Sequence, residues 1–154
     1  SSDLMTSYAP LLAKEKHTQW SPDLIYFNNR EVKPTTGYYV QKLYGQNAGS
    51  HYIPSQIILD NQDNRVKLRI GSSIVRDSKT GDVIVKLVNL LPVSVETEIQ
   101  LPGIGSVQPS AVRTVLVGAP ESTPLPVTDT IEVGTNFKQQ LPAYSFTVIR
   151  LKTK

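Results

Sequence analysis

Residues 73–90, SIVRDSKTGDVIVKLVNL, decide the fold class of this chain. Two apolar-rich segments flank the turn Lys79-Thr80-Gly81-Asp82, which is typical of a β-hairpin. The second segment, VIVKLV at 83–88, is almost continuously apolar. Because such a run suits a strand that is buried on both faces, we expect residues 83–88 to form a central strand of a covered sheet.

Six further segments have the length and the apolar–polar alternation of β-strands. Turn and loop signals separate these segments, and no helical repeat lies between them. Parallel strands need long crossover connections, usually helices, and the segments between these strands are too short for them. The pattern predicts a mainly β protein, an antiparallel, jelly-roll-like β-sandwich. The predicted strands are HYIPSQIIL at 51–59 with Pro54 near an edge, RVKLRI at 65–70, VSVETEIQL at 93–101, AVRTVLVG at 111–118, DTIEVG at 129–134 and LPAYSFTVIRLK at 141–152.

Alternation also predicts which side chains fill the sandwich, because successive side chains of a strand point to opposite faces. Glu96 and Glu98 fall on the polar side of 93–101, so we interpret them as a solvated face rather than as a catalytic carboxylate pair. The expected inward-facing side chains are Val66, Leu68, Ile70, Val85, Leu87, Val93, Val95, Thr97, Ile99, Leu101, Tyr144, Phe146 and Val148.

The first 45 residues follow a different pattern. Apolar residues at helical spacing predict a helix over 4–12, although Pro10 interrupts it, and DLIYF at 23–27 predicts a short buried strand. The segment 34–45, PTTGYYVQKLYG, predicts a second helix with Thr35 or Thr36 as N-cap and Gly45 as C-cap. A helix–strand–helix unit at 1–45 thus precedes a sandwich at 46–154. The apolar face expected for the second helix comprises Tyr39, Val40, Leu43 and Tyr44.

Three stretches together, MTSYAPLL at 5–12, WSPDLIYFNN at 20–29 and PTTGYYVQKLYGQNAG at 34–49, resemble the end of the catalytic barrel in α-L-arabinofuranosidases of glycoside hydrolase family 51. The following strands, ending in LPAYSFTVIRL, resemble the C-terminal β-domain of that family. The resemblance implies a (β/α)8 barrel upstream and a retaining mechanism with two glutamates. No position here matches either glutamate motif, so we expect a C-terminal part of a longer enzyme that is inactive alone.

The resemblance also selects candidate site residues. If 23–27 is a barrel strand, its C-terminal end faces the active site, so Asn28 and Asn29 are candidates for substrate contact. Asparagine is equally suited to forming a turn there. Trp20 is a candidate for stacking on a sugar, although packing of a loop is the more common role of a single tryptophan. His17 and His51 have no partner at metal-ligand spacing, and we expect no cofactor or metal.

Composition limits the partners. The net charge is +3, the basic residues are scattered, and no aromatic platform accompanies Arg65, Lys67 and Arg69, so nucleic acid is not expected. No apolar run is long enough for a membrane span, and without cysteines the compartment stays open between secreted, periplasmic and cytoplasmic.

Three functions remain open at this point. The first is an accessory domain that braces the barrel of an arabinose-releasing glycosidase. The second is an independent carbohydrate-binding module, and the third an unrelated protein-interaction sandwich. The expected partners under the first are the chain's own barrel and, through the parent enzyme, an arabinose-containing polysaccharide. An apolar surface left on residues 1–45 also predicts self-association of the isolated chain.

Overall fold

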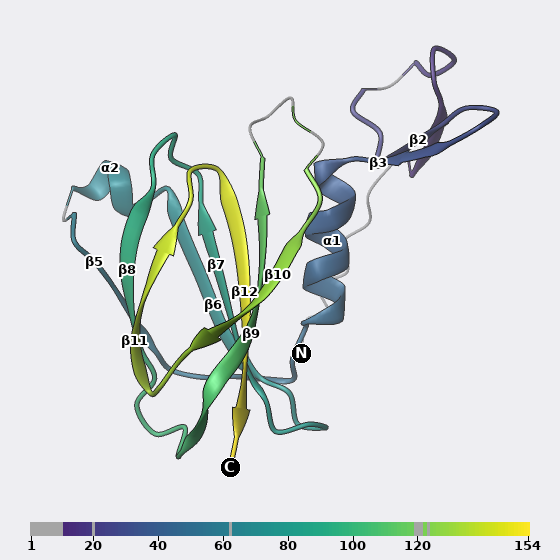
Figure 1. Cartoon of the computed structure of the whole chain (residues 1–154). Coiled ribbons are helices and arrows are strands. Elements are labelled where there is room, and N and C mark those ends of the chain that lie inside the picture. Colours follow the sequence, from purple (N-terminus) through teal and green to yellow (C-terminus); the bar gives the residue numbers. More distant parts are fainter. Residues whose placement is uncertain (1–10, 20, 62, 119–121, 123) are drawn as a thin grey trace, which may run out of the picture.

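Two antiparallel sheets packed face to face form the sandwich (Figure 1), and a small third sheet lies beyond the first turn of the long helix. The strand order is β10-β9-β12-β7-β6-β4 in the larger sheet, β11-β8-β5 in the smaller, and β1-β2-β3 in the third. The computed structural model describes residues 11–19, 21–61, 63–118, 122 and 124–154. The elements are β1 Leu12–Lys14, β2 Ile25–Phe27, β3 Val32–Pro34, α1 Thr36–Gln46, β4 His51–Tyr52, β5 Gln56–Leu59, α2 Asn64–Lys67, β6 Ile70–Arg76, β7 Val83–Asn89, β8 Val95–Gln100, β9 Val107–Val117, β10 Val127–Glu132, β11 Asn136–Leu141 and β12 Ser145–Thr153.

The predicted hairpin over 73–90 is confirmed, with β6 and β7 as its strands. Two backbone hydrogen bonds close the turn: the Asp77 N–H donates to the Asp82 carbonyl at 2.9 Å, and the Gly81 N–H donates to the Asp77 carbonyl at 2.8 Å. Gly81 has φ 78, a left-handed conformation that glycine adopts without steric cost. Six of the seven residues of β7 are buried, which confirms that this strand is covered on both faces.

One face of the six-stranded sheet packs against the three-stranded sheet. The side chains between them come from both sheets and are almost all aliphatic, so burial of apolar surface is the main source of stability here. This inner core consists of Ile53, Ile74, Val83, Val85, Leu87, Ile99, Leu101, Ile104, Ala111, Leu141, Ile149 and Leu151.

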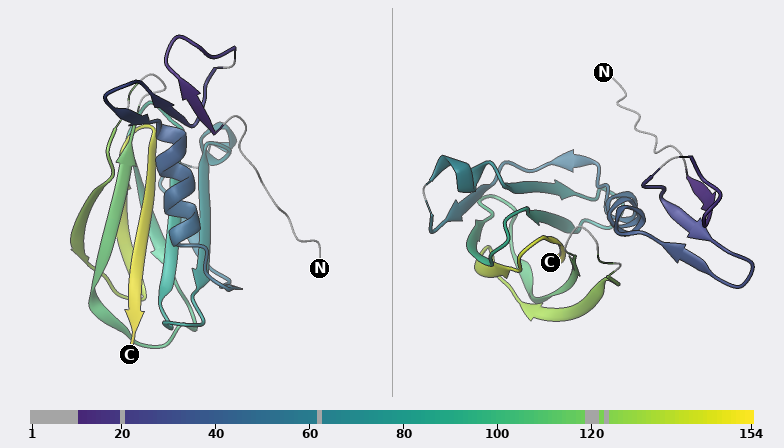
Figure 2. Two further views of the ribbon diagram at one scale, coloured as in Figure 1. Left: turned by 90° about the vertical axis from the view of Figure 1, so that its right-hand side faces the viewer. Right: turned by 90° about the horizontal axis from the view of Figure 1, so that it is seen from above.

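The other face of the six-stranded sheet is covered in part by α1 (Figure 2). The helix presents the predicted face, and Leu43 is buried in one cluster with Leu116 of β9 and Val148 of β12. The Tyr44 ring stacks on the Phe146 ring with centroids 4.7 Å apart. The predicted C-cap at Gly45 is wrong: the helix continues to Gln46 and Asn47 caps it, because the Asn47 side chain donates to the Leu43 carbonyl.

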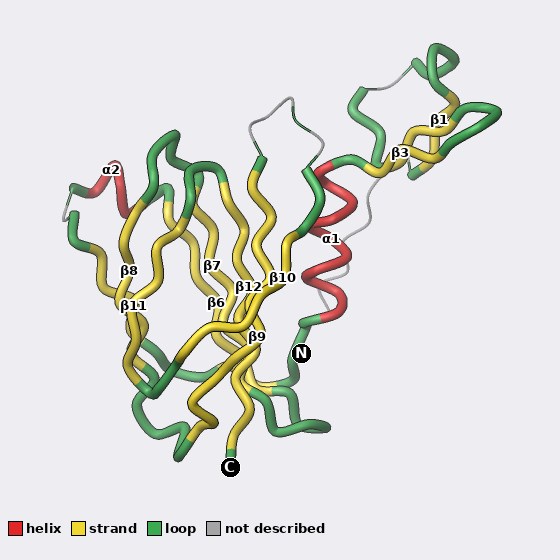
Figure 3. Tube along the Cα trace, viewed as in Figure 1, coloured by secondary structure: helices red, strands yellow, loops and turns green. Residues whose placement is uncertain are grey.

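The prediction of a strand at 65–70 is wrong. Residues 64–67 form the short helix α2 instead, as Figure 3 shows in red. Asp63 caps its N-terminus by accepting a hydrogen bond from the Arg65 N–H at 2.8 Å. Val66 is therefore half-buried and Leu68 is exposed, and the three basic residues do not line a strand face.

Other strand predictions need smaller corrections. The segment 51–59 is two strands in two sheets, since β4 pairs with β6 and β5 pairs with β8, and Pro54 lies between them. Strand β11 was not predicted at all, because NFKQQL lacks apolar alternation, yet it pairs with β8 over six residues. Besides Leu68, two further residues expected to point inward are exposed: Val93 precedes β8, and Tyr144 precedes β12.

The helix predicted over 4–12 lies almost entirely outside the described residues. Its last residue, Leu12, begins strand β1, so no helix reaches that position. The strand predicted at 23–27 is present as β2 but is only half-buried, because the sheet that contains it is small and stands away from the core. The predicted boundary between residues 45 and 46 falls in the last turn of α1.

We expect Leu87→Ala to lower the free energy of unfolding by about 2–5 kcal/mol, because Leu87 is fully buried in the inner core and truncation leaves a cavity there. Urea denaturation monitored by far-UV circular dichroism measures this loss. The matched control is Leu68→Ala, at an 84% exposed leucine, which should change stability by less than about 0.5 kcal/mol. Equal effects of the two substitutions would mean that the facing of β7 is misassigned.

Candidate functional site

The candidate residues Asn28 and Asn29 lie on the small sheet, which extends away from the sandwich (Figures 1 and 2). β1 and β2 are parallel, with Ala13 opposite Tyr26, and β2 and β3 are antiparallel, with Tyr26 opposite Lys33. Hydrogen bonds extend the parallel pair at both ends: the Ile25 N–H donates to the Leu11 carbonyl at 3.0 Å, and the Glu15 N–H donates to the Phe27 carbonyl at 2.9 Å. The tip of this sheet is the turn between β2 and β3.

Asn28 holds that turn. Its side-chain oxygen accepts hydrogen bonds from the backbone N–H groups of Arg30 at 2.9 Å and Glu31 at 3.0 Å. Its side-chain nitrogen donates to a Glu15 carboxylate oxygen at 2.9 Å. The Asn28 N–H also donates to the Glu31 carbonyl at 3.0 Å. The amide group of Asn28 is thus engaged in turn formation, the alternative role that asparagine has at such positions.

A charge network ties the turn to β1. The Lys33 ammonium lies 2.8 Å from one Glu15 oxygen and 3.5 Å from a Glu31 oxygen. Hydrogen bonds from Lys33 and then Asn28 hold the pKa of Glu15 below its ordinary value, and the same contact with Glu15 raises the pKa of Lys33. Both groups are therefore charged near neutral pH. These contacts could not be read from the sequence, because they depend on the parallel pairing of β1 with β2.

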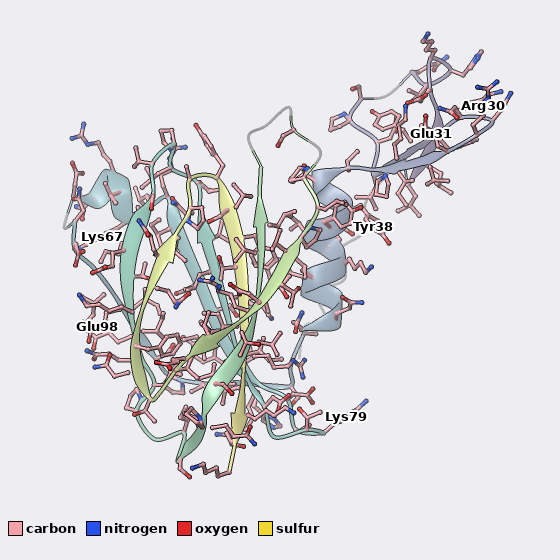
Figure 4. All side chains as sticks on the ribbon, viewed as in Figure 1. Arg30, Glu31, Tyr38, Lys67, Lys79 and Glu98 are labelled. Atoms are coloured by element: carbon pink, nitrogen blue, oxygen red, sulfur yellow. The ribbon has the colours of Figure 1, made fainter. Side chains whose placement is uncertain are left out.

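Asn29 is exposed at the tip, next to Arg30 and Glu31, which Figure 4 shows at the far end of the hairpin. The tip borders a shallow hollow that also has apolar walls, formed by Leu12, Phe27 and Val32. Asn28 and Asn29 are thus brought together at this hollow, with Asn28 directed into the turn. Trp20, the third candidate, lies outside the described residues.

The small sheet joins α1 through Leu24. The Leu24 carbonyl accepts two hydrogen bonds from Thr35, from its N–H at 3.1 Å and from its hydroxyl at 2.7 Å. Thr35 is the N-cap residue of α1, which was one of the two predicted alternatives. Its hydroxyl, however, bonds to Leu24 and not to the helix. Beside this junction Asp23 is fully buried, and neither carboxylate oxygen has a hydrogen-bond partner in the part of the chain that the structure describes.

Outside the small sheet, the described residues contain no constellation that suggests chemistry. Glu96 is exposed and pairs with Lys138 at 2.9 Å, and Glu98 accepts a hydrogen bond from Gln100, so both belong to a solvated strand face (Figure 4). No three described His, Asp or Glu side chains are grouped to hold a metal ion. Within the described ranges, no helix is long and apolar enough to cross a membrane.

Comparison with known proteins identifies the family. A family model of the α-L-arabinofuranosidase C-terminal domain matches residues 4–145. The chain belongs to this family. The arabinose-bound structure of MgGH51, a GH51 α-L-arabinofuranosidase, is similar over 96% of the chain with a TM-score of 0.82 and 33% sequence identity. The GH51 α-L-arabinofuranosidase of Thermotoga petrophila, at 14% identity and a TM-score of 0.63, shares the fold.

The curated proteins that are similar to this chain are also α-L-arabinofuranosidases. An extracellular exo-α-L-arabinofuranosidase of Streptomyces chartreusis is 50% identical over 52 residues, which are 34% of this chain and 6% of that protein. A probable α-L-arabinofuranosidase A of Aspergillus terreus is 34% identical over 104 residues, which are 66% of this chain and 15% of that protein. The chain also spans only 24% of MgGH51. It therefore corresponds to a minor part of each of these longer proteins, the C-terminal β-sandwich domain.

We expect Asn28→Ala to loosen the tip of the small sheet, because the Arg30 and Glu31 N–H groups lose their acceptor and Glu15 loses a donor. Amide hydrogen exchange at Arg30 and Glu31 should accelerate while exchange in β7 stays unchanged. Asn29→Ala is the matched control and should leave the tip amides as protected as before. Unchanged exchange in Asn28→Ala would contradict the turn-forming role.

Proposed function

We propose that this chain is the C-terminal accessory domain of a retaining α-L-arabinofuranosidase that releases terminal L-arabinofuranose from arabinose-containing polysaccharides. The observation that supports this most is the family match over 4–145 together with 33% identity to an arabinose-bound GH51 enzyme over 96% of the chain. A retaining glycosidase needs one carboxyl group as acid and base and a second as nucleophile. In this proposal both belong to the barrel that precedes the small sheet.

The role of the chain itself is structural: it braces that barrel. The arrangement of α1 supports this role, because its apolar face packs on the sandwich while its N-cap residue, Thr35, bonds to Leu24 of the small sheet. The helix thus couples a segment that resembles the end of the barrel to a sandwich with a complete inner core. Such coupling fixes the position of the barrel strand β2 relative to the sandwich.

The tip of the small sheet is the part of the chain that we place nearest to substrate. The C-terminal ends of barrel strands carry the active sites of such enzymes, and Asn29 follows strand β2 at that end. Asn29 is exposed and suited to contact a sugar hydroxyl, whereas Asn28 acts by shaping the turn. Glu15 and Lys33 support the same turn from β1 and β3.

The sandwich offers less support for an independent carbohydrate-binding module. Such modules use several exposed aromatic side chains on one surface. Among the described residues after 46, the exposed aromatic side chains are Tyr52 and Tyr144. Tyr52 lies on edge strand β4 and Tyr144 precedes β12, and strands β7 and β6 separate the two. They do not form one binding platform.

A parent polypeptide that includes the upstream barrel should hydrolyse 4-nitrophenyl α-L-arabinofuranoside, and the 154-residue chain alone should not exceed a buffer blank. The physical reason is that this proposal assigns both catalytic carboxyl groups to the barrel. The release of nitrophenol, followed by absorbance, measures the activity of the parent polypeptide and of the 154-residue chain. Activity of the 154-residue chain above the blank would overturn the assignment of both groups to the barrel.

The isolated chain should self-associate through the small sheet, because Leu12 and Val32 are 61% and 64% exposed there. Light scattering over a concentration series should show a rising mass, which Leu12→Glu should suppress. The matched control is Val112→Glu, at a 48% exposed valine on β9 of the sandwich. A strictly monomeric chain whose residues 11–45 are fully protected from hydrogen exchange would refute this proposal.

A further inference from the structure

A polar cleft opens between the two sheets of the sandwich, on the side where each sheet has an edge strand. These edge strands are β10 in the six-stranded sheet and β11 in the three-stranded sheet. The cleft has a volume of about 230 Å³. Its polar lining residues are Arg113, Asp129 and Gln140, and its apolar lining residues are Val115, Val127 and Pro142. This mixed lining differs from the inner core, where the side chains are almost all aliphatic.

The strand register explains why a charged pair lies at this cleft. Asp129 of β10 is opposite Arg113 of β9, and Arg113 is opposite Ile149 of β12, so the three residues share one row across the sheet. Ile149 belongs to the inner core, which places this row on the inner face of the sheet. The Arg113 and Asp129 side chains are 25% and 45% exposed. The row therefore changes from aliphatic to charged toward the edge of the sheet, where a ligand has access.

The Arg113 guanidinium is held from two directions. Its Nε donates to one Asp129 oxygen at 2.9 Å and its Nη2 donates to the other, so this contact is bidentate. Its Nη1 donates to the side-chain oxygen of Gln139, on β11 of the other sheet, at 3.0 Å. The guanidinium thus connects the two sheets, which is a structural role. These contacts use three of the five N–H donors of an arginine, so each terminal nitrogen keeps one N–H for a ligand.

Charge compensation decides the class of ligand. The hydrogen bond from Arg113 lowers the pKa of Asp129, and the same contact raises the pKa of Arg113, so both groups are charged near neutral pH. Among the described residues that line the cleft, Arg113 is the only basic one, and Asp129 neutralises it. An anion therefore gains little there. A hydroxyl group can accept from Arg113 while an adjacent hydroxyl donates to Asp129, and adjacent hydroxyl groups are characteristic of neutral sugars.

A buried hydroxyl group beside the cleft also favours a polar ligand. Thr147 of β12 is opposite Val115, one of the lining residues. Thr147 is 1% exposed, and its Oγ1 has no hydrogen-bond partner in the part of the chain that the structure describes. Most buried side-chain hydroxyls are satisfied by protein or by ordered water. An unsatisfied hydroxyl next to Val115 favours a polar group, rather than an apolar one, at this side of the cleft.

The size of the cleft limits the ligand to about one sugar unit. Pockets for drug-sized ligands have volumes of about 300–1,000 Å³, and the volume of this cleft, about 230 Å³, is smaller. The C–H groups of one sugar ring can pack on Val115 and Val127 while its hydroxyl groups face the charged pair. Gln140 is exposed at the rim and adds a side-chain amide that can both donate and accept. A site of this kind needs no aromatic platform.

We propose that the cleft between β10 and β11 binds one neutral sugar unit, a terminal L-arabinofuranose of the polysaccharide, through Arg113, Asp129 and Gln140. The choice of arabinofuranose rests on the proposed function, whereas the preference for a neutral sugar over an anion rests on the cleft alone. The sandwich then holds a side chain of the polysaccharide in addition to bracing the barrel.

Titration of the 154-residue chain with methyl α-L-arabinofuranoside, followed by ¹H–¹⁵N NMR, tests this site. We expect saturable shifts at the Arg113 Nε–H and the Gln140 side-chain amide. The dissociation constant should be on the order of millimolar, because the ligand has only about eleven non-hydrogen atoms. Gln140→Ala should weaken binding about threefold to tenfold, since an exposed side chain that bonds to the sugar is removed. The matched control is Thr130→Ala, an exposed residue on the opposite face of β10, which should bind like the wild type.

Asp129→Asn tests the class of ligand, because it preserves the size of the side chain and leaves the charge of Arg113 uncompensated. The wild type should bind D-galacturonate, a sugar that carries a carboxylate, more weakly than the arabinoside. Asp129→Asn should reverse this order of affinity, since the carboxylate can then pair with Arg113. Far-UV circular dichroism verifies the fold of each variant.

Three results overturn the proposal: no saturable shift with the arabinoside, unchanged affinity in Gln140→Ala, and tighter binding of galacturonate than of the arabinoside by the wild type. The titration requires no hydrolysis, so its failure leaves the proposed function standing. Hydrolysis of 4-nitrophenyl α-L-arabinofuranoside by the parent polypeptide tests that function separately. An inactive parent whose isolated C-terminal chain binds the arabinoside would count against the proposed activity and not against the cleft.

Discussion

The contact between α1 and the outer face of the six-stranded sheet is the constraint on which the rest of the structure depends. β7 and β12 carry apolar side chains on both faces, with Ile84, Phe146 and Val148 on the outer one. Those side chains would face water without the helix, and their burial requires the apolar stripe of α1 at this place. Because the small sheet continues directly into α1, the same contact sets where that sheet stands relative to the sandwich.

Polar contacts fix the helix along its axis. The carbonyl end of a helix carries partial negative charge, yet α1 has no basic residue in its last turn. The sheet supplies the cations instead. The Lys86 ammonium lies 3.5 Å from the Ala48 carbonyl and 5.4 Å from the centroid of the Tyr44 ring, and the Arg150 guanidinium donates to Asp82 at 2.9 Å and to Asn47 at 3.4 Å. Burial lowers the pKa of Lys86, because it disfavours the charged ammonium. The partial negative charge at the end of the helix favours the ammonium and acts against this shift.

The sequence predicts those parts of this structure whose periodicity and packing agree. The β6–β7 hairpin, the doubly covered β7 and the apolar face of α1 were all predicted, because one local pattern determines each of them. The prediction of a strand at residues 65–70 is wrong because the capping contact at Asp63 favours a helical turn over the extended conformation that the alternation indicates. Strand β11 is absent from the predictions because its pairing with β8, and not its own composition, makes it a strand.

The candidate site was predictable only in part, for a related reason. Asparagine after a predicted strand indicates either a turn or a polar contact, and the choice depends on partners far away in the sequence. Glu15 reaches Asn28, and Lys33 reaches Glu15, only once β1 and β3 lie on either side of β2. No spacing rule connects these residues, so sequence analysis could name Asn28 and Asn29 but could not separate their roles.

The buried charges show how differently the two ends of α1 are stabilised. Lys86, at the C-terminal end, has a carbonyl and an aromatic face as partners. Asp23, near the N-terminal end, is equally buried, but neither of its carboxylate oxygens is hydrogen-bonded within the described residues. An unpaired buried carboxylate is costly. Within the described residues, the junction between the small sheet and the helix thus lacks the polar partners that Lys86 has at the opposite end of α1.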